Sequence, residues 1–150
     1  TLLEGAGLLT GLEKYAGDII RKRASRPKFQ VFNNALLSAQ SPGNFSDKAT
    51  DPKEWGRLTE SAIGAHLLNS SLNRQFNLYY WNENNQEVDF VLESRGRVIG
   101  IEVKTCKVSK NSGLGKFEAA FRPLANFLVG TDGIPVEEFL ATDPYSLFSI

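Results

Sequence analysis

The stretch EVDFVLESRGRVIGIEVK, residues 87–104, decides the fold of this 150-residue chain. Apolar and polar residues alternate in residues 87–92 and again in residues 99–104, where Val, Ile and Phe are abundant, so the pattern predicts two β-strands. Arg95 and Gly96 lie between them and suit a two-residue turn, because glycine readily takes the positive φ that such turns require. The sequence therefore predicts a β-hairpin in which Ser94 pairs with Arg97.

This register places Asp89 directly opposite Glu102, and Glu87 opposite Lys104. Directly paired residues have Cβ atoms about 4.5–5.5 Å apart, and like charges at that distance are destabilising. Two such carboxylates need a proton or a cation between them, and Mg²⁺ takes oxygen ligands of this kind. Lys104 on the same face could then orient or activate a water beside the metal. The alternative is a solvent-facing hairpin with ordinary surface charges and no ligand.

A helix is predicted upstream, over residues 52–69, because Asp51 can cap it and Pro52 suits its first position. Helical spacing puts Glu60 on an apolar, small-residue stripe that points toward protein, where an unpaired charge is costly. We expect Glu60 to face the sheet and His66 to face away from it. Arg57, one turn before Glu60, could simply neutralise this carboxylate. The stripe contains Gly56, Ile63, Gly64 and Leu67.

A helix with Glu60, a strand with Asp89 and then the run Glu102-Val103-Lys104 resemble the PD-(D/E)XK nuclease superfamily, which has the restriction-endonuclease-like fold. More closely, the chain resembles a C-terminal domain of unknown function found in bacterial and archaeal AAA+-type ATPases. The likeness runs from the first residues to about residue 130. The segments that carry it are residues 2–9, 26–36, 56–64, 80–81, 87–92 and 101–104.

The resemblance implies roles for five residues. Asp89 and Glu102 would be ligands of Mg²⁺ or Mn²⁺, with the carbonyl oxygen of Val103 as a further ligand. Lys104 would be the catalytic lysine and Glu60 an accessory acid. The expected activity is metal-dependent hydrolysis of phosphodiester bonds in DNA.

Two alternatives stay open beside that activity. The domain could be a non-catalytic module of an ATPase that binds DNA or protein and keeps the nuclease fold. It could also be a simple interaction or regulatory domain whose acids serve only in salt bridges. In the resembling family an ATPase module usually precedes this domain, and this sequence contains no Gly-x-x-x-x-Gly-Lys-Ser/Thr motif of its own.

The expected organisation is a partial winged-helix-like linker over residues 1–50 and an α/β nuclease-like domain over residues 51–150. The domain would have a restriction-endonuclease-like core: helix, strand, strand, strand, helix, strand, with a mixed sheet. The remaining expected elements are a short helix over 1–9, a strand over 29–32, a helix over 33–40, a loop over 41–47, strands over 77–82 and 124–129, and a helix over 114–121.

Charge and composition add expectations about partners and location. Net charge is zero, yet residues 19–46 contain five basic residues and no acid, and Arg21, Lys22 and Arg23 there could contact phosphates. Lys107, in a second acid-free stretch, is a further candidate for nucleic-acid contact, although short basic runs are also typical of solvated linkers. The single Cys106 suits a reducing compartment, and no apolar run spans a membrane or forms a signal peptide, so we expect a cytoplasmic protein. Starting at Thr1 and lacking methionine, the chain is expected to be a fragment or processed product that lacks its N-terminal module.

Overall fold

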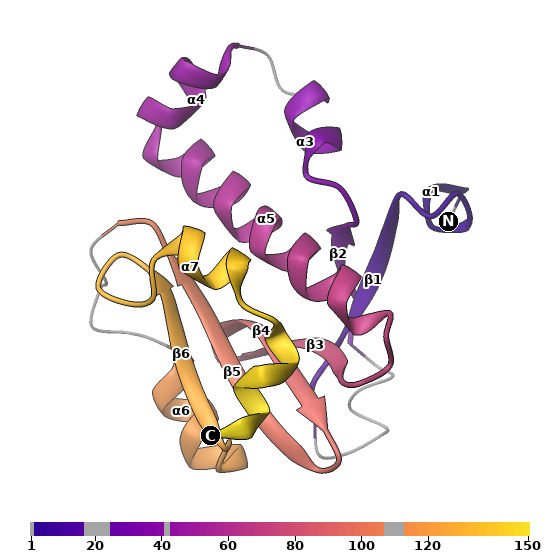
Figure 1. The fold of residues 1–150 in the computed structure, drawn as a ribbon, viewed down its shortest axis with the longest axis vertical. Coiled ribbons are helices and arrows are strands. Elements are labelled where there is room, and N and C mark those ends of the chain that lie inside the picture. Colours follow the sequence, from indigo (N-terminus) through magenta and orange to yellow (C-terminus); the bar gives the residue numbers. More distant parts are fainter. Residues whose placement is uncertain (1, 17–24, 41–42, 107–112) are drawn as a thin grey trace.

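A six-stranded mixed sheet organises the computed structural model, which describes residues 2–16, 25–40, 43–106 and 113–150 (Figure 1). Its strand order is β2-β1-β3-β4-β5-β6, and helices lie on both of its faces. The predicted α/β class is therefore confirmed. The strands are β1 (Leu9–Lys14), β2 (Lys28–Val31), β3 (Asn77–Glu83), β4 (Gln86–Ser94), β5 (Arg97–Lys104) and β6 (Ala125–Gly130).

The helices of the described residues range from single turns to the long α5. They are α1 (Leu2–Gly5), α3 (Ala35–Gln40), α4 (Phe45–Thr50), α5 (Pro52–Ser71), α6 (Gly113–Phe121), α7 (Val136–Ala141) and a final 3₁₀ helix, η1 (Pro144–Ser149). Helix α5 begins as predicted, because the Asp51 side chain accepts hydrogen bonds from the backbone N–H groups of Lys53 and Glu54.

The central hairpin has the predicted turn. Ser94 pairs with Arg97, and the ladder continues to Phe90 opposite Ile101. Arg95 and Gly96 both have positive φ, at 52° and 77°, as a two-residue hairpin turn of this type requires. Local turn chemistry therefore sets the register over this part of the hairpin.

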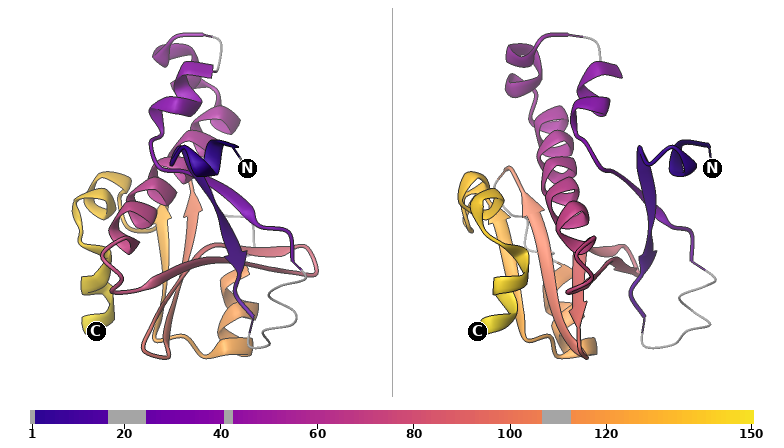
Figure 2. Two further views of the ribbon diagram at one scale, coloured as in Figure 1. Left: turned by 90° about the vertical axis from the view of Figure 1, so that its right-hand side faces the viewer. Right: turned by 45° about the vertical axis from the view of Figure 1, so that its right-hand side comes forward.

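Two apolar layers cover the sheet. On one side α5, α7 and η1 pack on the strands through residues such as Ile63, Leu67 and Phe139. On the other side α6, the crossover between the parallel strands β5 and β6, inserts the fully buried Phe117 against Trp81. Figure 2 shows α7 and α6 on opposite sides of β5 and β6. The long helix and the sheet thus bury a continuous core between them.

The N-terminal segment differs from expectation. The predicted helix covers only Leu2–Gly5, and the unpredicted β1 follows it. Strand β1 pairs antiparallel with β2 and parallel with β3, so both N-terminal strands belong to the same sheet as the later ones. Part of the loop predicted over residues 41–47 is instead the start of α4, which Asn44 and Asp47 close with a capping box. The domain boundary near residue 50 stays a prediction.

An acidic candidate site around Asp89

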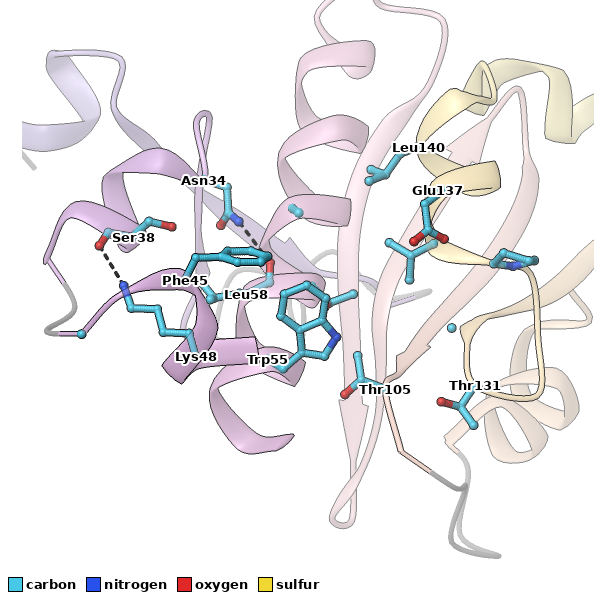
Figure 3. A pocket seen from close by; sticks show the side chains of 16 residues that line it. Asn34, Ser38, Phe45, Lys48, Trp55, Leu58, Thr105, Thr131, Glu137 and Leu140 are labelled. Atoms are coloured by element: carbon cyan, nitrogen blue, oxygen red, sulfur yellow. Dashed lines mark hydrogen bonds between the residues drawn. The ribbon is translucent and has the colours of Figure 1, made fainter. Parts of the chain in front are cut away.

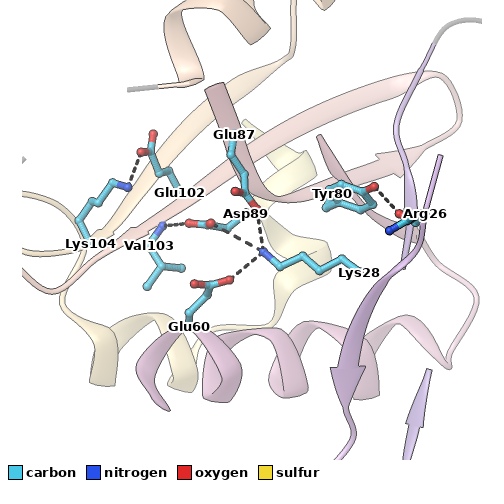
Figure 4. Close-up of polar contacts among 9 residues, drawn as sticks. All are labelled: Arg26, Lys28, Glu60, Tyr80, Glu87, Asp89, Glu102, Val103 and Lys104. Atoms are coloured by element: carbon cyan, nitrogen blue, oxygen red, sulfur yellow. Dashed lines mark hydrogen bonds and ion pairs between the residues drawn. The ribbon is translucent and has the colours of Figure 1, made fainter. Parts of the chain in front are cut away.

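A β-bulge positions Asp89. Tyr79 of β3 pairs with Val91 of β4 and Trp81 pairs with Val88, so two residues of β4, Asp89 and Phe90, lie opposite one residue of β3. As a result Val88 and Val91 both pack on the α6 side, although they are three positions apart. The extra residue breaks the alternation that the sequence suggested, and the Asp89 side chain turns toward α5 (Figure 4).

The predicted direct pairing of Asp89 with Glu102 is therefore wrong. The carboxylate of Asp89 accepts a hydrogen bond of 2.8 Å from the backbone N–H of Val103. Val103 contributes to the core on the α5 side, whereas the Gly100 position faces Phe117 of α6. Because successive residues of a strand alternate between faces, Glu102 lies on the α6 side with Gly100. The bulge has separated two carboxylates that a regular hairpin would have placed side by side.

A lysine from the edge strand β2 sits among three carboxylates (Figure 4). The Lys28 Nζ lies 2.7 Å from Glu60 Oε1, 3.1 Å from Glu87 Oε1 and 3.9 Å from Asp89 Oδ1. It also stands 5.6 Å from the centre of the Phe90 ring, within the range of a cation–π contact. We call Lys28, Glu60, Glu87 and Asp89 the acidic cluster.

The pKa values within the cluster follow from its burial and its charges. Burial, then the neighbouring charge of Glu60, raises the pKa of Asp89 from its ordinary value to about 7, against the opposing effects of the Val103 hydrogen bond and of Lys28. Burial lowers the pKa of Lys28, but the charge and hydrogen bond of Glu60, with the charges of Asp89 and Glu87, more than compensate and raise it overall. The cluster therefore keeps Lys28 protonated and disfavours the charged form of Asp89.

A second ion pair lies beside the cluster. Glu102 is only 2% exposed, and its Oε1 lies 2.9 Å from the Nζ of Lys104, whose side chain is 38% exposed. Burial works against the charge of Lys104, yet its pKa is raised by the hydrogen bond and charge of Glu102, and further by Asp89 and Glu60. The carboxylate of Glu102 and those of the acidic cluster therefore both favour the charged form of Lys104. The residues predicted from the sequence lie in one region of the molecule (Figure 4).

Lys28 was not predicted from the sequence. Arg57 was considered as the residue that neutralises Glu60, but its guanidinium group lies 3.8 Å from the carboxylate of Glu54. His66 behaves as predicted, since its ring meets Phe139 of α7 and its Nε2 lies 3.0 Å from the Thr142 carbonyl oxygen. Arg21, Lys22, Arg23 and Lys107, the predicted nucleic-acid contacts, lie outside the described residues.

A cavity of about 820 Å³ lies next to the site and does not contain it (Figure 3). Thr59 and Thr105 line it, each next in sequence to a site residue, Glu60 or Lys104. The rest of its wall is mostly apolar: Phe45, Trp55, Leu58, Pro135, Val136 and Leu140. The polar residues of the motif therefore meet around Lys28, not around the cavity.

The carboxylates supply the hard oxygen donors that Mg²⁺ or Mn²⁺ prefers. Their chemistry fits a cation, because three of them already converge on the ammonium group of Lys28. Within the described ranges, however, no three acidic, histidine or cysteine side chains form a group that could hold a metal ion as they stand. The carboxylate oxygens are suitable ligands for a metal ion, but the Lys28 ammonium group occupies the position between them.

Comparison with known proteins identifies the family. A family of domains of unknown function, DUF4143, matches residues 55–136, which is more than half of the chain. The chain belongs to this family. The match includes Glu60 and the whole 87–104 hairpin, and it is consistent with the resemblance to a C-terminal domain of AAA-type ATPases. No curated protein and no solved structure gives a significant match.

None of the described helices combines the length and apolar character needed to cross a bilayer.

Proposed function

We propose that this DUF4143 domain is a nuclease-like domain of the PD-(D/E)XK type that accompanies an AAA-type ATPase module and hydrolyses phosphodiester bonds in DNA. The observation that carries the proposal is the convergence of the Glu60 and Asp89 carboxylates, from α5 and β4, on the Lys28 ammonium group, with the Glu102–Lys104 ion pair on the adjacent strand β5. The order α5, β3, β4, β5, α6, β6 also agrees with the restriction-endonuclease-like core.

In this proposal Asp89 and Glu60, which converge on Lys28 on the α5 side of the sheet, would hold Mg²⁺ or Mn²⁺, whereas Glu102 on the α6 side would hold Lys104 in place. The bound ion would supply Lewis-acid activation of the phosphate and of a water. Lys104 reaches solvent from its pair with Glu102, so its ammonium group is placed to bind an anionic phosphate or to orient a water. Glu60, whose carboxylate raises the pKa of both Asp89 and Lys28, sets the charge of the site.

A cleavage assay on mixed single- and double-stranded DNA with Mg²⁺ or Mn²⁺, and with EDTA as the blank, tests the function. We expect metal-dependent cleavage by the natural protein, and losses of about 10²-fold or more for Asp89→Asn and Lys104→Met, since single groups that stabilise developing charge contribute on that scale. Lys116→Met, an exposed charge on α6, is the matched control and should cleave normally. Circular dichroism must show that each variant is folded.

A second candidate function is a non-catalytic module that binds DNA or protein. The Lys28 ammonium group favours it, because it already neutralises the carboxylates that a metal would need. DNA retention on a native gel without any cleavage, by natural protein and Lys104→Met alike, would support this alternative against the nuclease.

A further inference from the structure

Close packing of β2 on α5 determines the position of Lys28. This packing involves Gln30, two residues after Lys28 in the strand. Gln30 is buried, and its Nε2 donates hydrogen bonds of 3.0 Å to the carbonyl oxygens of Val31 and of Ser61 in α5. The amide packs against the helix at Gly64, where any Cβ would overlap the Gln30 side chain. The Gln30 side chain therefore sets where β2 lies along the helix.

Strand and helix spacing then dictate where Lys28 lies. Two residues of a strand advance about 6.6 Å, and four residues of a helix advance about 6 Å. The step from Gln30 back to Lys28 therefore matches the step from Gly64 back to Glu60. The result is the 2.7 Å ion pair between Lys28 and Glu60, in which neither side chain is fully exposed. This contact is built into the packing of β2, so it differs from a chance surface pair.

The same strand is attached to the rest of the sheet through a short ladder. Strand β2 is at the edge of the sheet and pairs with β1, which meets β3 at only two register pairs, Glu13 with Tyr79 and Lys14 with Tyr80. The Tyr80 hydroxyl also donates a 2.6 Å hydrogen bond to the carbonyl oxygen of Arg26, just before β2. Lys28 thus belongs to a hairpin that can shift as a unit more easily than the central strands can.

We infer that Lys28 is a built-in cation that occupies the acidic cluster and competes with a divalent metal ion for Asp89 and Glu60. Metal binding then requires the Lys28 ammonium group to withdraw, so β2 regulates access to the site. The inference rests on the proposed function for the identity of the ion and deepens it by naming the competitor. It concerns binding of the ion, which can be measured without nucleic acid.

Titration calorimetry with MnCl₂ compares the natural protein with Lys28→Met, which keeps the length of the side chain and removes its charge. We expect Lys28→Met to bind Mn²⁺ at least about tenfold more tightly, because an opposite charge within about 4–6 Å changes the affinity of a carboxylate for a competing cation by tenfold or more. Lys53→Met, an exposed charge at the start of α5, is the control and should match the natural protein. The double variant Lys28→Met/Asp89→Asn should lose the gain, which places the ion at the cluster.

A second measurement uses the natural protein, so a misfolded variant cannot hide the answer. Amine-reactive labelling, followed residue by residue by mass spectrometry, should become faster at Lys28 on addition of Mn²⁺ and stay constant at Lys53. Equal Mn²⁺ affinities for the natural protein and Lys28→Met, or no binding by either, overturn the inference, as does a Lys28 labelling rate that Mn²⁺ leaves unchanged. Tighter binding by Lys28→Met without any DNA cleavage would reject the nuclease and keep this inference. DNA cleavage by the natural protein without tighter Mn²⁺ binding by Lys28→Met would keep the nuclease and overturn this inference.

Discussion

Replacing Asp89 by asparagine tests the electrostatics of the acidic cluster most directly. Asparagine has nearly the same size and keeps an oxygen that can accept the 2.8 Å hydrogen bond from Val103. It removes the carboxylate that faces Glu60 and Glu87 in a side chain only 13% exposed. The substitution therefore changes charge at this position while changing little else.

The sign of the effect follows from proton binding. Burial and the charge of Glu60 raise the pKa of Asp89 from 3.8 to about 7. Between these two values the folded protein keeps a proton on Asp89 that the unfolded chain has lost, so stability falls as pH rises and levels off above about pH 7. Lys28 and Lys104 have pKa values raised above 10.5, so their contributions are present throughout this window and are lost only at more alkaline pH.

The size of the effect can be worked from the same values. A rise of about 3 pKa units corresponds to about 4 kcal/mol at about 1.4 kcal/mol per unit. The charge of Glu60 contributes to this rise and the charge of Lys28 opposes it, so the energy belongs to the cluster and not to Asp89 alone. We therefore expect the natural protein to lose about 2–4 kcal/mol of stability relative to Asp89→Asn between about pH 4.5 and pH 7.5.

Urea unfolding followed by tryptophan fluorescence at the two pH values measures this difference. The control is Asp132→Asn, at an exposed turn position with φ of 63° that asparagine also tolerates, and it should track the natural protein at both pH values. An Asp89→Asn protein whose stability relative to the natural protein is the same at both pH values would refute the reasoning. So would a natural protein that gains stability over this range relative to the variant.

Two further predictions concern packing and the second ion pair. Gly64→Ala should destabilise the protein by about 1–3 kcal/mol in urea unfolding, because the new methyl group overlaps Gln30. Gly115→Ala in α6 is the control: its methyl group contacts nothing, so it should be neutral or slightly stabilising. Equal effects of the two substitutions would contradict this prediction. Lys104→Ala should lower the free energy of unfolding by about 2 kcal/mol at neutral pH, because the buried Glu102 carboxylate loses the ammonium group of Lys104. Adding Glu102→Gln should restore part of this stability, and a double-mutant cycle measures the difference.

The sequence predicts what local chemistry controls. The Arg95–Gly96 turn and the Asp51 cap of α5 appear as expected because each depends on a few adjacent residues. Strand β1 was missed, and part of the reason is that its parallel partner, β3, lies more than sixty residues later in the chain. Such pairing is decided by the whole sheet, and the local propensity of residues 9–14 indicates it only weakly.

Of the acidic cluster, the sequence pointed to Glu60 and Asp89 but not to Lys28, and it did not predict the geometry around Asp89. Residues 90–92 are all apolar, so they hide the position at which the alternation shifts, and the bulge at Asp89 has no sequence signal of its own. The partner of Glu60 was sought on the same helix, at Arg57, whereas it comes from Lys28, 32 positions away. Alternating polar residues in β2, with Lys28 and Gln30 on one face, were the signal that could have indicated it.

The glycines that flank Glu60 explain why the site forms at this point of α5. Gly64 admits Gln30 and with it strand β2, as the overlap at its Cβ position shows. On the other side, a Cβ at Gly56 would lie 3.1 Å from the Thr105 Oγ1, so the end of β5 also approaches the helix closely there. Glu60 stands between these two contacts, one turn from each. A carboxylate at that position meets Lys28 from β2 and feels Lys104 near the end of β5, and a larger residue at either glycine would push one of them away.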